Sequence, residues 1–254
     1  MTFKQQIHPT CKSRVEIEKE WDAIAPIRDI QISQGKDISF LEVLLPALEK
    51  LTINSDLSNV LDVGCGVGFV TEVLSTKASS VMGVDLSKRS IELAQKRLKN
   101  THHAHFFYGS IEEFAQKTVP QSFSLAVANM TLMTALDLMS LLRSVAKLLP
   151  IGAHFVFTIT HPCFWSHYWG YDTAEWFHYG QEIVVEAPFK ISLDVADVVT
   201  THIHRPLSQY INSLIEVGFL IEAVLEPLPP FDTNPEYLHN WKQPRFLAIR
   251  CVRQ

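Results

Sequence analysis

The sequence lacks the features that mark exported, membrane-spanning or zinc-binding proteins. No stretch of its 254 residues approaches the roughly 18 uninterrupted apolar residues of a membrane helix, and its polar start has no apolar segment of a secretory signal. Only four cysteines occur, and none has the CxxC spacing of a zinc site or redox dithiol: Cys11, Cys65, Cys163 and Cys251. We therefore expect a protein of the reducing cytoplasm without a membrane span.

A block of charge of one sign is also missing. The chain carries 22 basic and 27 acidic residues, spread along its length, for a net charge of −5. Nucleic acids and anionic membranes are bound through dense basic surfaces, so we expect neither as a partner; nothing in the sequence specifies an oligomeric state. The neighbouring His102, His103 and His105 lack thiols or carboxylates in motif positions, so no metal site is expected.

Apolar residues are plentiful, at 47% of the chain, and they follow an α/β pattern. From Asn59 onward short apolar strands alternate with amphipathic helices, which is typical of a mainly parallel sheet. The expected strands are residues 60–63, 81–84, 105–108, 125–128 and 155–159. We expect the whole chain, residues 1–254, to form one domain with residues 56–160 as its cofactor-binding core.

Two helices are expected within residues 1–55, as a cap on the sheet. The first spans residues 15–25 and is expected to stop at Pro26, because proline removes a backbone donor and clashes with the preceding turn. The second helix is expected to begin at a capping box formed by Ser39 and Glu42.

The strand-helix alternation is interrupted at residues 161–204. A dense aromatic stretch there precedes two segments of alternating polarity, 183–191 and 198–203, and we expect this insert to form a lid over the substrate site. Residues 205–254 then contribute a last helix, which starts at Pro206, and two final strands.

A glycine-rich turn follows the first strand, in VLDVGCGVGFVTEVL. Gly64, Gly66 and Gly68 lie between this strand and a helix, where missing side chains let a ligand approach the backbone. The dinucleotide fingerprint GxGxxG needs a glycine where Phe69 stands, so the spacing argues against a nicotinamide cofactor.

Two carboxylates lie at the ends of neighbouring strands. Asp62 would repel a pyrophosphate but attract the ammonium group of a methionine moiety. Asp85 closes the second strand in VMGVDLS, where its oxygens can accept both hydroxyls of a ribose. Either residue alone could be an ordinary strand-end or capping residue; their joint spacing favours a nucleoside that carries an amino-acid group.

These segments resemble motifs I and II of the class I S-adenosylmethionine-dependent methyltransferases. LDVGCGVG matches the first motif and GVDLS the second, and YGSIEEF and VANMTLM are similar to the segments after the third and fourth strands. The resemblance implies a Rossmann-like α/β fold, with a seven-stranded, mostly parallel sheet whose last strand is antiparallel, N-terminal helices and an inserted lid. It also implies S-adenosyl-L-methionine as cofactor and S-adenosyl-L-homocysteine as product.

The resemblance assigns one set of residues to the cofactor: Asp62, Gly64, Cys65, Gly66, Gly68, Asp85, Leu86, Ser110, Ile111, Asn129 and Met130. Ser110 stands where the family more often has aspartate, which weakens the expected contact to the adenine amine. Arg28 is a further candidate, for the cofactor carboxylate, with Trp21 beside it. The alternative is that Arg28 is a solvated charge and Trp21 a packing residue.

The resemblance places the methyl acceptor over the fourth and fifth strands, where the aromatic insert begins. Four rings are candidates for a wall against a flat, apolar or cationic molecule: Trp165, Tyr168, Trp169 and Trp176. These rings could instead only pack the lid onto the core.

His161, directly after the fifth strand in ITHPCF, is the first candidate for a general base, because free histidine titrates near neutral pH. It could instead hydrogen-bond the turn before Pro162. An acceptor that is already ionised would need no base at all.

His204 and Arg205, in THIHRPLS, are further candidates for contact with the acceptor. Arg205 could bind a substrate carboxylate through paired hydrogen bonds. It could equally pair with Glu182 or Glu186 of the insert.

We therefore expect SN2 transfer of a methyl group to an oxygen, nitrogen or carbon of a small aromatic or apolar metabolite, with a quinone or sterol precursor as a lipid-like variant. The NPPY-type signature of enzymes that methylate nucleic-acid bases is absent at residues 129–132, which again argues against DNA. The alternatives are a nicotinamide-dependent oxidoreductase and a non-catalytic cofactor-binding protein.

Overall fold

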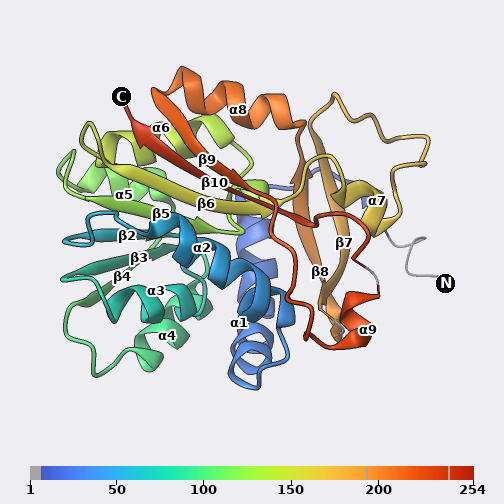
Figure 1. The fold of residues 1–254 in the computed structure, drawn as a ribbon, viewed down its shortest axis with the longest axis horizontal. Helices are drawn as coiled ribbons and strands as arrows, with labels where there is room; N and C mark the ends of the chain where they lie inside the picture. The colour runs from blue at the N-terminus through green and yellow to red at the C-terminus, as the bar shows by residue number, and fades with distance from the viewer. Residues whose placement is uncertain (1–6, 193, 240) are drawn as a thin grey trace.

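The computed structural model describes residues 7–192, 194–239 and 241–254. Figure 1 shows its main sheet of seven strands, in the order β4-β3-β2-β5-β6-β10-β9. The strands are β2 (Val60–Val63), β3 (Val81–Asp85), β4 (Ala104–Tyr108), β5 (Leu125–Asn129), β6 (His154–Thr160), β9 (Phe219–Leu225) and β10 (Phe246–Arg253). The first five are parallel, and β10 runs antiparallel to both β6 and β9, so the predicted sheet with an antiparallel last strand is confirmed.

Helices cover both faces of this sheet (Figure 1). Their apolar side chains pack against the side chains of the strands. One face carries α5 (Ile111–Lys117), α6 (Leu138–Leu148) and α8 (Leu207–Glu216). The other carries α2 (Leu45–Thr52) and α3 (Phe69–Ser75), and α4 (Lys88–Arg97) lies along β3, β4 and α1 (Arg14–Ser33). None of the helices in the described part of the chain is long and apolar enough to cross a membrane.

The first helix is longer than predicted. A capping box of Ser13 and Glu16 starts α1, which continues through Pro26 to its last residue, Ser33, so the predicted stop is wrong. The helix continues because residues beyond the proline, such as Ile32, are buried against the sheet. This packing offsets the roughly 3 kcal/mol that an interior proline costs a helix.

The second predicted helix has a different start. It divides into η2 (Ser39–Leu44), a π-helix, and α2 (Leu45–Thr52). The predicted capping box of Ser39 and Glu42 is wrong, because Ser39 Oγ lies 2.7 Å from the hydroxyl of Tyr237 and Asp37 Oδ1 accepts the hydrogen bond from Phe40 N at 3.0 Å. Ser39 therefore ties this segment to a distant part of the chain.

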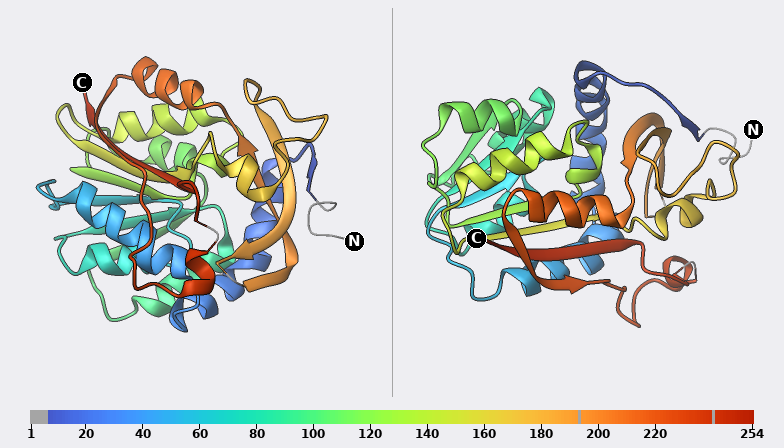
Figure 2. Two further views of the ribbon diagram at one scale, coloured as in Figure 1. Left: turned by 45° about the vertical axis from the view of Figure 1, so that its right-hand side comes forward. Right: turned by 90° about the horizontal axis from the view of Figure 1, so that it is seen from above.

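The aromatic insert forms a second, three-stranded sheet beside the first. Its strands are β7 (Ile183–Ile191), β8 (Asp194–His204) and, at the outer edge, β1 (His8–Pro9). Both alternating segments are strands as predicted, although β8 starts before residue 198. Figure 2 shows the β7-β8 hairpin standing next to α1 across one end of the main sheet, with the short α7 (Trp165–Trp169) near its base.

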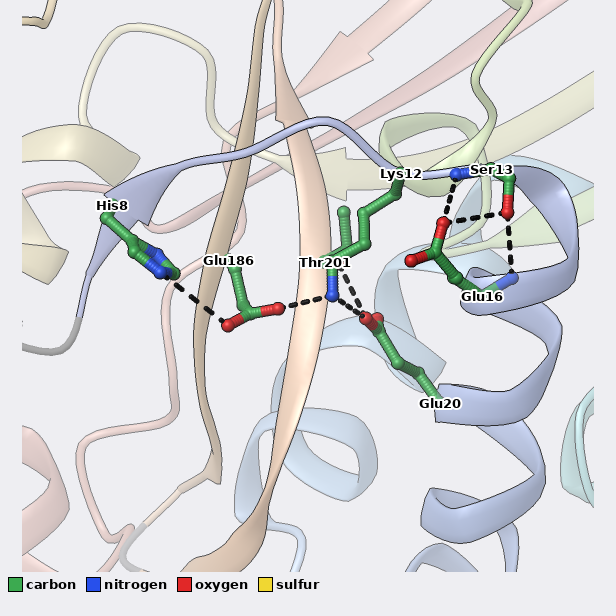
Figure 3. Close-up of polar contacts among 7 residues, drawn as sticks. All are labelled: His8, Lys12, Ser13, Glu16, Glu20, Glu186 and Thr201. Carbon is green, nitrogen blue, oxygen red and sulfur yellow. Dashed lines mark hydrogen bonds and ion pairs between the residues drawn. The ribbon is translucent and has the colours of Figure 1, made fainter.

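Ion pairs fasten the long edge of this hairpin to α1, as Figure 3 shows. Lys12 Nζ lies 2.9 Å from Glu20 Oε1 of α1 and also pairs with Glu186 of β7. Thr201 of β8 donates a hydrogen bond to the same Glu20 oxygen at 3.0 Å. The two carboxylates raise the pKa of Lys12 above its ordinary value, so this lysine stays charged.

The tip and the root of the hairpin are also held. At the tip, Ser192 Oγ accepts a hydrogen bond from the backbone N of Ser39 at 3.1 Å and donates to Asp37 Oδ1 at 3.3 Å. At the root, Arg205 pairs with Glu182 and donates to backbone carbonyls of the loop after β5. The hairpin is therefore tied to the main domain at three separate places.

Candidate functional site

A cavity of about 610 Å³ lies at the carboxyl ends of β2, β3 and β5. Open α/β sheets bind their ligands in this position. Residues of α1 and η2 line one wall, and residues of α7 and the β7-β8 hairpin line another. The volume is within the range of small-molecule sites, about 300 to 1,000 Å³.

The glycine-rich turn lies at the end of β2. Gly64, Gly66 and Gly68 have φ of +69°, +53° and +86°, which residues with side chains rarely adopt. A Cβ at Gly64 would lie 2.3 Å from Thr131 Oγ1, and one at Gly68 would lie 2.9 Å from Ala94 Cβ. A Cβ at Gly66 would meet nothing within 4 Å, so this glycine opens onto the cavity. Gly68 is the N-cap of α3 and packs against the protein instead.

Asp85 shapes this turn from the neighbouring strand. Its Oδ2 accepts a hydrogen bond from Gly66 N and its Oδ1 accepts one from Ser87 N, both at 2.8 Å. Burial raises the pKa of Asp85 to about 6, although these two bonds favour the ionised form. A carboxylate has about four lone-pair positions, so Asp85 keeps acceptor capacity toward the cavity that it lines.

Asp62 is fully buried beneath the same turn. Its Oδ2 accepts a hydrogen bond from Thr71 Oγ1 at 2.7 Å, whereas its Oδ1 has no partner among the described residues. Burial raises the pKa of Asp62 from 3.8 to about 7, against the opposing effect of the Thr71 bond. A cation that reached Oδ1 would supply the missing partner and stabilise the carboxylate.

The remaining predicted cofactor residues from the core also line the cavity: Cys65, Leu86, Ser110, Ile111, Asn129 and Met130. Ser110 caps α5 by accepting a hydrogen bond from Glu113 N at 3.1 Å, so its hydroxyl oxygen already has a structural role. Asn129 Oδ1 accepts a hydrogen bond from Thr158 at 2.7 Å, and the next residue, Met130, has a φ of +57°. The bond between Asn129 and Thr158 helps to fix the chain where β5 ends.

Arg28 and Trp21 both line the cavity from α1. Arg28 Nη1 lies 2.7 Å from Oδ2 of Asp37, a carboxylate that is only 2% exposed. The charge of Arg28 is therefore balanced within the protein and is not free in solvent. A cofactor carboxylate would share Arg28 with Asp37, and the cofactor role of Arg28 stays a prediction.

His161, the predicted general base, lies outside the cavity lining formed by the described residues. Its Nε2 is 2.8 Å from Glu226 Oε1, and its Nδ1 accepts a hydrogen bond from Cys163 N at 3.2 Å. The ring thus orders the turn that follows β6, which is the alternative interpretation. The catalytic role predicted for His161 has no support from its position.

Three of the four predicted aromatic residues line the cavity: Trp165, Tyr168 and Trp169. Trp165 and Trp169 lie with ring centroids 5.4 Å apart, on one side of α7. Trp176 instead stacks on Tyr171 at 5.4 Å and belongs to the apolar cluster under the insert, so its predicted substrate contact is not supported.

His204 and Arg205 are engaged by the protein itself. His204 Nε2 lies 2.9 Å from the carbonyl oxygen of Tyr179. Arg205 is 1% exposed; its Nε donates to Glu182 at 2.6 Å and its Nη2 donates to Ala135 O at 2.6 Å. These contacts leave Arg205 no face for a substrate carboxylate, and pairing with Glu182 is the alternative that the structure shows.

Among the cavity residues that were not selected from the sequence are His202 and Arg245. His202 Nε2 lies 3.0 Å from the hydroxyl of Tyr171, and burial lowers the pKa of His202 to about 3, so its ring is neutral. His202 and His204 are two residues apart on β8, so their spacing predicts the same face for both side chains, and it does not show that only His202 lines the cavity. Nothing in the local sequence distinguishes Arg245 from an ordinary surface arginine before a strand.

Comparison with known proteins gives a family match over residues 54–200, to the family described as methyltransferase domain. The chain is similar to the ubiquinone biosynthesis O-methyltransferase of Vibrio atlanticus, with 28% identity over 117 residues, which are 46% of this chain and 49% of that protein. The protein of the same name from Proteus mirabilis is 31% identical over 100 residues, 39% of this chain and 40% of that protein. The chain thus spans about half or less of the length of these curated relatives.

Solved structures of similar fold cover more of the chain. A methyltransferase dependent on S-adenosylmethionine from Mesorhizobium loti has a TM-score of 0.62 at 23% identity, covering 82% of this chain and 96% of that one. The 1,6-didemethyltoxoflavin-N1-methyltransferase of Burkholderia thailandensis, with 1,6-didemethyltoxoflavin and S-adenosylhomocysteine bound, has a TM-score of 0.61 at 14% identity, covering 98% and 95%. These likenesses confirm the predicted Rossmann-like class I methyltransferase fold.

Proposed function

Because the chain belongs to the methyltransferase domain family, we propose that it is a cytoplasmic enzyme that transfers a methyl group from S-adenosyl-L-methionine to a small molecule. The observation that carries the proposal is the buried Asp62, whose unpartnered Oδ1 lies beside the glycine-rich turn. A site of this kind suits a ligand that is both a nucleoside and an amino-acid cation. It does not suit a pyrophosphate, which a buried carboxylate would repel.

The residues around the turn fit this cofactor. Asp62 Oδ1 would accept a hydrogen bond from the ammonium group, and Asp85 has acceptor capacity for the ribose hydroxyls. Gly66 leaves the space in which a ligand can lie against the backbone. Leu86 and Ile111 supply apolar surface for the adenine ring. When bound, the cofactor supplies a methyl group activated by its attachment to a sulfonium.

The chain itself contributes orientation and the exclusion of water, which account for much of the barrier to such a transfer. Trp165, Tyr168 and Trp169 of α7 form an aromatic part of the cavity wall and would hold the acceptor. We assign no general base, since His161 bonds Glu226 and the neutral His202 has its Nε2 at the Tyr171 hydroxyl. The acceptor that fits best is therefore one that ionises readily by itself.

Two features support a small-molecule acceptor. The curated relatives are named as O-methyltransferases of ubiquinone biosynthesis, and one structural neighbour is an N1-methyltransferase with 1,6-didemethyltoxoflavin bound. The cavity volume of about 610 Å³ accommodates a cofactor and a compact metabolite. The net charge of −5 gives no basic surface for a nucleic acid. We propose an aromatic or apolar metabolite as the acceptor and no nucleic-acid partner.

Titration calorimetry with S-adenosylhomocysteine tests the cofactor assignment. We expect wild-type protein to bind it, and both Asp62→Asn and Asp85→Ala to weaken binding by about 10- to 100-fold, which is about 1.4 to 2.8 kcal/mol. Glu216→Gln is the control, because Glu216 lies on the surface in an exposed pair with Arg143 and should leave the affinity unchanged. Absence of binding to wild-type protein, or equal binding by Asp85→Ala, would refute the assignment.

Two further measurements separate the alternatives. Fluorescence titration with NADH should show no saturable binding; saturable binding would favour the oxidoreductase. Release of S-adenosylhomocysteine from S-adenosylmethionine in a metabolite extract should depend on the protein. Binding of the cofactor without any such release would favour a non-catalytic cofactor-binding protein.

A further inference from the structure

Arg245 is a buried cation in the wall of the cavity, directly before β10. Only 4% of this residue is exposed. Aromatic rings surround its guanidinium, with Cζ 3.9 Å from the ring centroid of Tyr168, 4.5 Å from that of Trp241 and 5.4 Å from that of Tyr237. Such ring stacking covers the faces of a guanidinium and leaves its donors free in the plane of the group.

No carboxylate in the described part of the chain pairs with this guanidinium, and its Nε has no hydrogen-bond partner there. Arg205, which is also buried, differs because it pairs with Glu182, and the partly exposed Arg28 pairs with Asp37. Burial lowers the pKa of Arg245, as expected for a cation without a counter-charge. Buried charges in proteins are otherwise paired, so Arg245 calls for a partner from outside the protein.

Two neighbouring side chains also have hydrogen-bond donors without an acceptor. The indole nitrogens of Trp165 and Trp241 are also buried without a partner among the described residues. Both indole rings pack on Phe246, with ring centroids 6.1 Å (Trp165) and 5.9 Å (Trp241) from the centroid of Phe246. Because Phe246 directly follows Arg245 in the sequence, the three residues with unpartnered donors belong to one cluster. Indole and guanidinium groups only donate hydrogen bonds, and Trp165 and Arg245 line the cavity, so a ligand there that is rich in acceptors would satisfy these two residues.

The position of Arg245 assigns it to the acceptor side of the cavity. The adjacent Phe246 pairs with Thr160 at the carboxyl end of β6, and β6 is separated from β2 by β5. Arg245 therefore lies about three strand spacings, or about 14 Å, from Asp62 at the end of β2. The rings beside it, Trp165 and Tyr168, belong to the aromatic part of the cavity and not to the glycine-rich turn.

We propose that Arg245 binds a carboxylate on an aromatic methyl acceptor and thereby determines which small molecules this protein accepts. The inference rests on the proposed function for its statement about methylation, but the anion site itself does not. A carboxylate matches one guanidinium in charge and in its planar, two-oxygen geometry. A phosphate monoester, with a charge of about −1.5 to −2 at neutral pH, would need further cations.

Calorimetry with simple probes tests this site in the full-length protein, with and without S-adenosylhomocysteine. Benzoate and 4-hydroxybenzoate are the anionic probes, benzamide is the neutral isostere and phenyl phosphate is the competing anion. We expect wild-type protein to bind at least one of the two acids at least about tenfold more tightly than benzamide or phenyl phosphate. Arg245→Gln should remove this preference for the acid, and Arg245→Lys should retain part of it, because lysine keeps the charge but loses the paired geometry.

Arg143→Gln is the control, since Arg143 is exposed and is not among the residues that line the cavity, so the substitution should leave probe binding unchanged. Unchanged affinity of Arg245→Gln for S-adenosylhomocysteine would show that the variant is folded and that Arg245 does not serve the cofactor. If Arg245→Gln fails to fold, Arg245→Lys supplies the test: it should bind the acid less tightly than wild-type protein does, and an unchanged preference for the acid over benzamide would count against Arg245.

Three outcomes would overturn the inference: neither acid binds wild-type protein, benzamide binds as tightly as the acids, or phenyl phosphate binds more tightly. Failure of the proposed function gives a different result. In that case S-adenosylhomocysteine does not bind any variant, while the acid still binds the protein alone and loses affinity in Arg245→Gln.

Discussion

A buried carboxylate with one free oxygen makes ligand binding sensitive to pH. Burial raises the pKa of Asp62 to about 7 and that of Asp85 to about 6 in the ligand-free protein. A bound ammonium group and bound hydroxyls favour the ionised forms, so binding below these pKa values must release protons. We expect the affinity for S-adenosylhomocysteine to rise with pH up to about pH 7.5, by up to about tenfold per unit above about pH 6, where only Asp62 is protonated, and by up to about 100-fold per unit below it, where both carboxylates are.

Calorimetry in buffers of different ionisation enthalpy measures both the affinity and the protons released. In Asp62→Asn the rise above about pH 6 should disappear, while Asp85 should still contribute below it. The control Glu216→Gln should follow the wild-type curve. A wild-type affinity that is flat over this range would contradict the assignment of the ammonium group to Asp62.

At the scale of elements, the β7-β8 hairpin depends on Lys12. This lysine joins Glu20 of α1 to Glu186 of β7, and the side chains of the two carboxylates are only 9% and 20% exposed. Lys12→Met would leave two shielded carboxylates without their shared cation. Because the site is partly solvated, we expect a loss of about 1 to 3 kcal/mol in the free energy of unfolding, below the full cost of a broken buried pair.

Hydrogen exchange resolved by peptide is the second measurement for this variant. Exchange should accelerate in β7 and β8 and remain unchanged in β2, and S-adenosylhomocysteine should dissociate faster because the hairpin lines its cavity. Lys77→Met is the matched control, since Lys77 and Glu49 form an exposed pair that should contribute less than about 0.5 kcal/mol. Equal effects of the two substitutions would contradict the role given to Lys12.

Most elements could be predicted because their signals are local. The apolar runs of β2, β3 and β5 follow from neighbouring residues, and the structure has these strands within about one or two residues of the predicted bounds. Pro26 and Ser39 misled the prediction because tertiary contacts decide their conformation. The partner of Ser39 is Tyr237, and no local pattern places these residues together.

At the scale of the whole molecule, the same buried carboxylates reduce stability. The native pKa of Asp62 is raised above its ordinary 3.8, so the native state binds more protons than the unfolded chain between about pH 4 and about pH 7. The free energy of unfolding must therefore fall as the pH rises through that window, by at most about 4 kcal/mol for this residue. The variant Asp62→Asn lacks this titrating group, so its free energy of unfolding lacks this contribution to the dependence on pH.

Urea unfolding of ligand-free protein at about pH 5 and about pH 8 checks this sign. Relative to wild type, Asp62→Asn should be more stable at the higher pH than at the lower one, by about 1 to 4 kcal/mol. A difference between the two proteins that is independent of pH would contradict the raised pKa. Improved stability together with weaker cofactor binding would show that this carboxylate is kept for binding at a cost to the fold.

The cofactor side of the site was predictable and the acceptor side was not. Asp62, Gly66 and Asp85 occur in one short stretch whose spacing fixes how they meet. The acceptor side combines α7, β8 and the residue before β10, which are separated by long stretches of chain. Which residues there can bind a ligand depends on which polar side chains already have partners within the protein. Arg205 is excluded as a ligand-binding residue because it pairs with Glu182, and Arg245 is identified as one because its Nε has no partner among the described residues.

The three attachments of the β7-β8 hairpin differ in kind. Its edge and its root are held by charged groups, whereas its tip is held by the hydroxyl of Ser192, at 3.1 Å from Ser39 N and 3.3 Å from Asp37. Because bonds of a neutral hydroxyl at these lengths are weaker than ion pairs, we expect the tip to open before the edge or the root. Substrate and product would then enter and leave the cavity past Ser39 and Ser192. Substitutions at these two serines would change the turnover rate without a contact to any reactant.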